Sequence, residues 1–237
     1  MGVSDSISRL ADYYRRHGLG ATMRRARLAG KRALFAGRMV VFYCDLDERR
    51  LRPVSIPKTF AVQRVKALTE LSAENLQEMT SFWNPELVNR NIRERFEKGA
   101  SLWLVESEDR LAGYGWTLEG QTIAPYYFPL GPDDVQLFDF YVFPRFRGRA
   151  IHWLLTSHIL HTLAAEGRSR AFADTGEWNQ AQLASFKMTP FRSLGFVRTY
   201  KVFGQVHTCW LVSEPADQEQ KGTARREKAM KLLRSNE

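Results

Sequence analysis

The segment from Val135 to Ile151 constrains the fold of this 237-residue chain more than any other. Residues 135–142 (VQLFDFYV) are rich in β-branched and aromatic side chains, a composition typical of a strand. Pro144 then ends strand pairing, and a short polar arch at residues 145–149 (RFRGR) leads into a helical pattern. The sequence therefore predicts a strand, a tight arch and the N-terminus of a helix in direct succession.

The predicted arch has the properties of an anion-binding site. The first N–H groups of a helix have no partner within the helix, and the helix dipole adds partial positive charge behind them. Gly148 has no side chain, so an anion can approach the backbone closely. Arg145 and Arg149 add charge in a geometry that suits phosphate. We expect the arch to cradle a phosphate or pyrophosphate.

The arch and its flanks resemble a signature of the GNAT superfamily of acetyl-CoA-dependent N-acyltransferases. Arg145-Phe-Arg-Gly148-Arg-Ala150 matches the pattern Q/R-x-x-G-x-G/A, and the strand before it ends in Tyr141-Val142-Phe143-Pro144. In that family the loop amides bind the pyrophosphate of coenzyme A. The resemblance implies acetyl-CoA as co-substrate, held by the main chain of Arg147, Gly148, Arg149, Ala150 and Ile151.

The order of elements from residue 60 to residue 212 is similar to that of a GNAT domain. Periodicity and turn residues predict strands at 60–71, 101–106, 110–118, 135–142, 169–174, 196–203 and 205–211, and helices at 72–83, 84–98, 149–166 and 179–186. The expected fold class is α/β, a GNAT-type mixed central sheet flanked by helices with a basic helical N-terminal extension. Residues 213–237 are polar and form an expected C-terminal tail.

Residues 1–59 form the expected extension before the domain. Residues 1–44 hold nine Lys or Arg against two Asp, so they carry seven of the nine net positive charges. Two short helices are predicted at 4–17 and 19–36, and a strand at 39–46. The basic amphipathic helix is expected to pack on the domain or on a partner subunit. Contact with an anionic membrane surface is the next alternative, and nucleic acid the last.

Composition places the chain among globular proteins of a reducing compartment. The hydrophobic fraction is 44%, no apolar run approaches the length of a membrane span, and the N-terminus lacks a signal-peptide core. Cys44 and Cys209 make no disulfide framework. We expect a cytoplasmic protein, with the alternative of a peripheral position at the inner face of the membrane.

Acyl transfer to an amine needs a group that removes a proton, because an alkylammonium has a pKa near 10. Asp139 is the first candidate, since a carboxylate within an apolar strand needs a wet cleft or an ion pair. Alternation predicts Asp139 and Tyr141 on the face opposite Phe138 and Phe140. The alternative is that Asp139 is a structural partner of an arginine. Asp174 and Glu177 are second choices.

The resemblance also implies roles for neighbouring residues. The main chain near Tyr141 and Val142 would pair with the pantetheine arm and offer a donor to the developing oxyanion. Asn179 is similar in position to a residue that contacts the coenzyme arm, although helix capping explains it equally well. Many family members carry a Tyr after this Asn to protonate the leaving thiolate, and here the region offers Phe186. Substitutes are Ser185, Tyr126, Tyr127, Tyr141 or water.

The sequence favours packing or surface roles for its histidines. His158 and His161 are three residues apart on the helix that also carries His152, but no third ligand is evident, so no metal site is predicted.

The resulting prediction is an N-acyltransferase that moves an acetyl group from acetyl-CoA to a primary amine. The acceptor could be an amino sugar, a polyamine, an amino acid or a protein amine. The alternative from another class is a non-catalytic acyl-CoA-binding or scaffold protein of the same fold.

Overall fold

The computed structural model describes residues 14–15, 18–24, 26–28, 38–47, 49, 51, 54–81, 84–123, 126–202 and 205–211. The expected tail at 213–237 lies outside these residues. Of the two N-terminal helices predicted at 4–17 and 19–36, the described parts at 14–15, 18–24 and 26–28 are helical.

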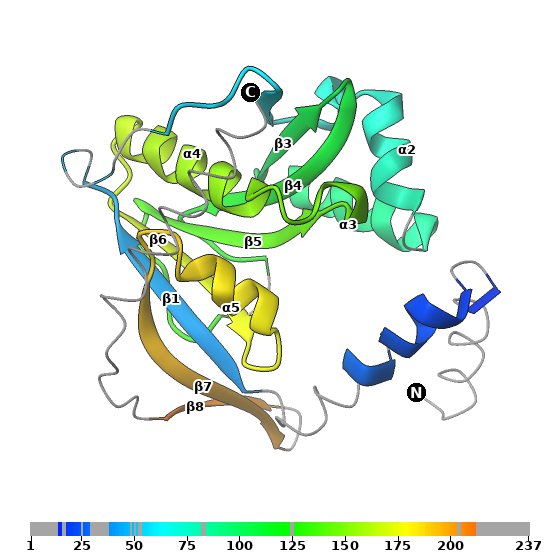
Figure 1. The fold of residues 1–237 in the computed structure, drawn as a ribbon. Helices are drawn as coiled ribbons and strands as arrows, with labels where there is room; N and C mark the ends of the chain where they lie inside the picture. Colours follow the sequence, from blue (N-terminus) through cyan, green and yellow to red (C-terminus); the bar gives the residue numbers. More distant parts are fainter. Residues whose placement is uncertain are drawn as a thin grey trace.

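The centre of the molecule is a mixed sheet of eight strands in the order β2-β3-β4-β5-β6-β1-β7-β8 (Figure 1). Its β5–β6 pair is parallel and its other pairs are antiparallel. The predicted fold class is therefore confirmed. The strands are β1 (Met39–Asp45), β2 (Phe60–Val65), β3 (Ser101–Ser107), β4 (Arg110–Glu119), β5 (Asp134–Val142), β6 (Arg170–Gly176), β7 (Arg192–Val202) and β8 (Gln205–Leu211).

In the part of the chain that the structure describes, four helices accompany the sheet: α2 (Ala73–Ser81), α3 (Pro85–Glu97), α4 (Ile151–Ala165) and α5 (Gln180–Phe186). The predicted starts of α2 and α3 are confirmed by their caps. Ser72 Oγ accepts from the N–H of Asn75 at 3.1 Å, and Asn84 Oδ1 accepts from that of Leu87 at 3.2 Å. A 3₁₀ turn, Leu68–Glu70, replaces the second half of the strand predicted at 60–71.

The two faces of the sheet are covered by different helices. Trp103 of β3 contacts His158 of α4, and Phe42 of β1 stacks on Phe186 of α5, so α4 and α5 share one face (Figure 1). On the other face Phe96 of α3 packs edge-on against Trp116 of β4. Both Trp103 and Trp116 are almost fully buried, and they anchor the two halves of the hydrophobic core.

Strand β1 corrects the expected domain organisation. It lies inside the sheet, pairing with β6 from Met39↔Gly176 to Asp45↔Arg170 and with β7 on its other edge. Val40, Val41 and Phe42 are buried. The sheet therefore begins earlier in the chain than residue 60, where the sequence suggested that the domain starts. The strand predicted at 39–46 is confirmed as β1, but a local sequence pattern does not reveal which distant strands it pairs with.

The described part of the N-terminal helix exposes its apolar side chains. Leu19 and Met23 are 66% and 64% exposed. These two side chains are therefore not packed on the domain, which was one half of the first interpretation of the amphipathic pattern; packing on a partner subunit stays a prediction. Among the residues that the structure describes, no helix combines the length and apolar character needed to cross a bilayer.

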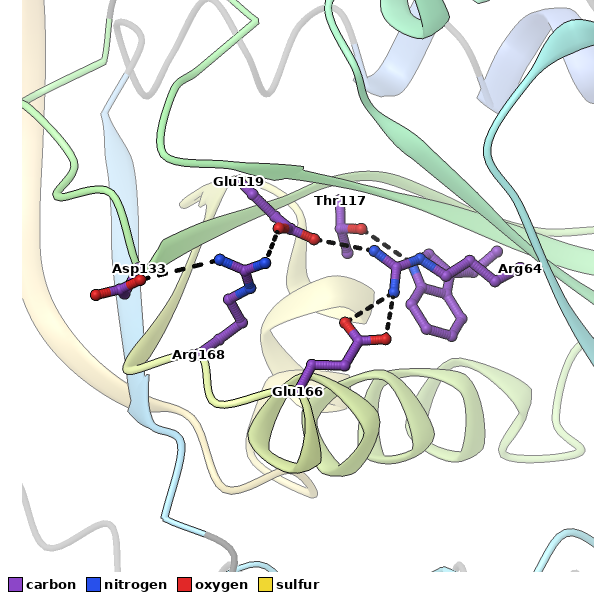
Figure 2. Close-up of polar contacts among 7 residues, drawn as sticks. Arg64, Thr117, Glu119, Asp133, Glu166 and Arg168 are labelled. Carbon is purple, nitrogen blue, oxygen red and sulfur yellow. Dashed lines mark hydrogen bonds and ion pairs between the residues drawn. The ribbon is translucent and has the colours of Figure 1, made fainter.

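A network of ion pairs fastens the C-terminal end of α4 to the sheet (Figure 2). Arg64 of β2 contacts both carboxylate oxygens of Glu166 at 2.7 and 2.9 Å and Glu119 of β4 at 3.0 Å. Its guanidinium also lies 4.8 Å from the ring centre of Trp103. Arg168 contacts the other oxygen of Glu119 at 2.6 Å. Because these groups are partly buried and bidentate, the network is stronger than isolated surface pairs.

Strand β5 contains a bulge opposite two glycines of β4. Tyr114 pairs with Tyr141 and Trp116 with Phe138, so β5 has one more residue than β4 over this stretch. Asp139 takes a positive φ of 49° within the bulge. A Cβ at Gly115 would lie 2.6 Å from the Phe140 ring, and one at Gly113 would lie 2.8 Å from the Tyr141 carbonyl oxygen. Glycine at both positions lets the bulge approach β4.

Replacing Gly115 with Ala is expected to lower the free energy of unfolding by about 1–3 kcal/mol, because the new methyl overlaps the Phe140 ring. Urea denaturation measures this change. Gly20→Ala is the control, since a Cβ there meets nothing within 4 Å, and it should leave stability unchanged or slightly higher. Phe140→Leu should relieve part of the loss in the double variant. Equal stability of Gly115→Ala and wild type would contradict the described packing.

Candidate active site

The predicted arch is present between β5 and α4. Pro144–Phe146 form a 3₁₀ turn, and Gly148 and Ala150 follow with positive φ values of 86° and 55°. Phe143 and Phe146 are buried and anchor the arch, while Arg145 and Arg149 lie over the Phe146 ring at 4.9 and 5.4 Å. The helix begins at Ile151, two residues later than predicted, because Ala150 has left-handed backbone.

The arch leaves backbone donors available. Among the described residues, the N–H groups of Gly148, Arg149 and Ala150 have no backbone or side-chain acceptor. A Cβ at Gly148 would meet nothing within 4 Å, so the space in front of the arch is open. Consecutive amides with alternating φ, followed by a helix N-terminus, form an anion-binding concavity. The available donors are therefore those of residues 148–150, whereas the N–H of Arg147 donates to the Pro144 carbonyl at 3.4 Å, and phosphate binding at residues 147–151 stays a prediction.

The arginines of the arch are held by neighbours. Arg145 pairs with Glu78 of α2 at 3.3 Å, and Arg149 with Glu108 of the β3–β4 turn at 3.3 Å. Arg147 donates from Nε to the Val142 carbonyl at 3.2 Å and lies over the Tyr141 ring. The carbonyl of Val142, predicted as part of the cofactor edge, is therefore occupied by this contact.

Strands β5 and β6 separate before β5 reaches the arch. They pair only from Asp134↔Arg170 to Leu137↔Ala173. Beyond that point β5 continues along β4, whereas residues 174–176 of β6 continue along β1. The edge of β5 from 138 to 142 that faces β6 has no strand partner among the described residues. Backbone groups on such an edge can pair with an extended ligand.

Asp139 lies in the bulge of β5 and pairs with an arginine. Its Oδ2 is 2.5 Å from Nη1 of Arg95 on α3, and Arg95 also lies over the Phe138 ring at 5.4 Å. The prediction that Asp139 and Phe138 lie on opposite faces is wrong, because the bulge interrupts the alternation of side chains. The ion pair fits the structural alternative for Asp139, and its catalytic role stays a prediction. Arg95 was not singled out from the sequence.

His152 lies one residue into α4 beside the parted strands. Its ring contacts Phe140 and Phe186 at centroid distances of 5.1 and 5.8 Å, and its Nε2 is 2.8 Å from Nε2 of Gln182. Its Nδ1 is buried without a hydrogen-bond partner. Burial lowers the pKa of His152 to about 4, so the ring is neutral at pH 7. The predicted packing role of this histidine agrees with these contacts.

The two residues of α5 named from the sequence have local roles. Asn179 caps the helix, with Oδ1 accepting from the N–H of Gln182 at 3.3 Å. Phe186 is buried between Phe42 and Phe191, and it offers no proton. Capping was the alternative given for Asn179, and its contact with a cofactor stays a prediction.

Asp174 and the loop before β5 form a second polar cluster. The Tyr127 hydroxyl donates a hydrogen bond to Asp174 Oδ2 at 3.1 Å, and the Tyr126 hydroxyl is buried without a hydrogen-bond partner. Burial raises the pKa of Asp174 above its ordinary value, and it raises the pKa of both tyrosines. The sequence suggested these residues separately. Their contact spans 47 residues, which no local pattern can reveal.

Glu177, the other second choice, pairs with Arg38 at 2.9 Å. Among the described residues, no three His, Cys, Asp or Glu side chains gather as a metal site would require.

The arch, the parted strands and the mixed sheet together define an α/β protein with a candidate anion site beside the point where two parallel strands separate. The model of the acetyltransferase (GNAT) family matches residues 67–189, a little over half of the chain. The chain therefore belongs to the GNAT family of acetyltransferases. A search of curated proteins found no match to this chain.

Several solved structures are similar in fold. A GNAT-family protein from Novosphingobium aromaticivorans has 15% identity and a TM-score of 0.44 over 68% of this chain and 61% of its own length. A tandem GNAT protein of the clavulanic acid biosynthesis pathway has 16% identity and a TM-score of 0.49 over 67% of this chain and 50% of its own. A GNAT acetyltransferase from Colwellia psychrerythraea has 15% identity and a TM-score of 0.49, over 67% and 53%. This chain thus spans one half to three fifths of these proteins.

His152 is expected to make stability fall between about pH 6.5 and pH 4. Its pKa is depressed in the folded state, so the unfolded chain binds the proton more tightly. The unfolded state is therefore stabilised relative to the folded state as the pH falls. The shift corresponds to roughly 3 kcal/mol. Urea denaturation at pH 7 and pH 4.5 should give a smaller pH-dependent loss for His152→Gln than for wild type. The exposed His207→Gln is the control and should retain the wild-type loss; identical losses in all three proteins would contradict this account.

Proposed function

We propose that this protein is an N-acyltransferase that moves an acetyl group from acetyl-CoA to a primary amine. The observation that carries the proposal is the arch, with unpartnered N–H groups at 148–150 and open space in front of Gly148. It lies at the end of β5, whose pairing with the parallel strand β6 stops at Leu137↔Ala173. An extended pantetheine arm that ends in a pyrophosphate has the shape and charge to use both features.

The residues present fit this co-substrate. Of the predicted residues, Gly148, Arg149, Ala150 and Ile151 would hold the pyrophosphate through their N–H groups, whereas the N–H of Arg147 already donates to the Pro144 carbonyl at 3.4 Å. The arm would lie along β5 near Tyr141 and Val142, and it would have to displace the contact of Arg147 with the Val142 carbonyl. Acetyl-CoA would supply an acyl group activated as a thioester. A hollow of about 240 Å³ beside Arg149, lined also by Thr59, Phe60, Ser107 and Glu108, gives space next to the arch for the rest of the coenzyme.

Asp139 and Tyr141 are the catalytic residues predicted from the sequence, and both lie at or beside the bulge of β5. Asn179 is the residue predicted to contact the coenzyme arm. The rival function is a non-catalytic acyl-CoA-binding scaffold. It is favoured by Phe186, which occupies the region where many family members have a tyrosine. Turnover of acetyl-CoA with an amine separates the two functions, since both require the arch.

The proposal also includes peripheral contact of residues 1–44 with a membrane surface. The exposed Leu19 and Met23 lie on a basic helix, a combination that suits an anionic bilayer surface. Co-sedimentation with anionic vesicles that is lost at high salt supports this contact, and the absence of sedimentation at low salt counts against it.

Gly148→Glu is expected to abolish coenzyme A binding, because a carboxylate in the arch blocks the pyrophosphate by bulk and by charge. Isothermal titration calorimetry with acetyl-CoA measures the effect, which should exceed about 100-fold in Kd. Gly99→Glu is the matched control. Gly99 has a similar φ of 78° and open space around it, but it lies at the end of α3.

Binding by wild type and Gly99→Glu, together with its loss in Gly148→Glu, supports the proposed co-substrate site. Failure of well-folded wild-type protein to bind acetyl-CoA contradicts the proposed function. Equal binding by Gly148→Glu and wild type contradicts the placement of the pyrophosphate at the arch.

A further inference from the structure

We propose that Asp174, hydrogen-bonded by Tyr127, binds the acceptor ammonium and removes its proton. We further propose that the acceptor is a primary amine with an aromatic or other apolar body. Both statements rest on the proposed function and deepen it, since they assign the removal of the proton to Asp174 in place of Asp139 and name the class of amine.

Asp174 occupies the point where the sheet divides. Leu137↔Ala173 is the last pair between β5 and β6, so Asp174 is the first β6 residue beyond the parting. Phe172, two residues earlier on the same face, contacts Phe128, and Asp174 contacts the neighbouring Tyr127. This face lies opposite α4, α5 and the arch. A coenzyme arm that enters between the parted strands β5 and β6 and an amine beside Asp174 would therefore meet from the two sides of the sheet.

Asp174 has no cation beside it. Among the described residues it makes no ion pair, whereas other acidic groups of this region have arginine partners. Asp139 pairs with Arg95, Glu177 with Arg38, and Asp134 with Arg170. A mostly buried carboxylate without a positive partner is costly unless a cation arrives with the ligand. An alkylammonium supplies that charge.

The surroundings of Asp174 fit an amine with an apolar body. Tyr126 packs against Tyr127 at 4.7 Å and against Phe128 at 5.3 Å between ring centres, and Trp210 of β8 lies 6.1 Å from Phe128. Beside them is a mainly apolar hollow of about 280 Å³, lined by Tyr43, Asp45, Phe128, Arg170, Phe172 and Leu194. Aromatic faces stabilise ammonium groups as well as apolar rings. The free hydroxyl of Tyr126 offers a further polar contact.

The surroundings of Asp174 raise its pKa, which makes it a stronger base than an exposed carboxylate. The titratable groups that face it are the phenols of Tyr126 and Tyr127, from the loop before β5. Val41 is its partner on β1, and Arg95 with Asp139 lie beyond Phe138 on the β5 side. Burial raises the pKa of Asp174, and the hydrogen bond from Tyr127 opposes this rise.

The proposed step conserves protons and electrons. Asp174 takes one proton from the ammonium, and the freed lone pair forms the C–N bond with the thioester carbonyl carbon as the C–S bond breaks. The second N–H proton neutralises the departing thiolate, directly or through water. Asp174 then returns its proton to solvent, so the products are an amide, a thiol and one proton.

The test uses the full chain with 2-phenylethylamine as the ammonium probe and 2-phenylethanol as its neutral counterpart. Calorimetry with the coenzyme A complex should show that Asp174→Asn weakens amine binding at least tenfold but leaves 2-phenylethanol binding unchanged. Asp139→Asn is the rival variant and should have a smaller effect, because Arg95 already compensates that charge. Asp133→Asn, a 63% exposed carboxylate at the far end of β5, is the matched control.

The pH dependence of kcat/KM for acetyl transfer gives an independent readout. Wild type should lose activity as the pH falls through the raised pKa of Asp174, and Asp174→Asn should lose at least about 100-fold in rate together with this limb. Tyr127→Phe should move the limb to higher pH, because it removes the hydrogen bond that stabilises the carboxylate. This shift tests the assignment even if Asp174→Asn does not fold.

The outcomes are separable from those for the proposed function. Absence of coenzyme A binding by wild type overturns both. With coenzyme A bound, three results overturn the Asp174 assignment alone: no binding of 2-phenylethylamine by wild type, equal amine binding by wild type and Asp174→Asn, or an acidic limb that is lost in Asp139→Asn and retained in Asp174→Asn. Retention of the limb position in Tyr127→Phe also counts against it.

Discussion

The parting of β5 from β6 is the constraint on which the rest of the structure depends. Two adjacent parallel strands separate only if each leaves the hydrogen bonds that the other would supply. The bulge in β5 makes this possible, since its extra residue turns the strand while it stays paired with β4. Gly113 and Gly115 leave room for the bulge, and Asp139 adopts the left-handed backbone that it needs.

Each parted strand is held on its other edge. β6 continues along β1, which is the first strand in the chain and lies buried between β6 and β7 in the sheet. β5 continues along β4, where Arg95 ties the bulge to α3 through Asp139 and Phe138. The network around Arg64 fixes the far end of α4 (Figure 2), so the helix that presents the arch is anchored at both ends.

Charge is distributed so that the two sides of the parting suit different partners. The arch offers backbone donors and three arginines on the side of α4, which favours an anion. On the other face Asp174 is a mostly buried carboxyl with a phenol as its partner and with aromatic rings around it, which favours a cation with an apolar body. His152 of α4, on the same side as the arch, is neutral at pH 7 and adds no charge there.

The sequence by itself determined the local elements: the caps at Ser72 and Asn84, the strand–arch–helix segment, and the family that its glycine pattern indicates. These depend on residues a few positions apart, which fix backbone geometry directly. Tertiary structure alone decided that β1 enters the sheet and that a bulge breaks the alternation at Asp139. It also decided that Arg95 pairs with Asp139 and that Tyr127 donates to Asp174. The contacts of Arg95 and Tyr127 join residues 44 and 47 positions apart, and all of these features depend on packing of the whole sheet.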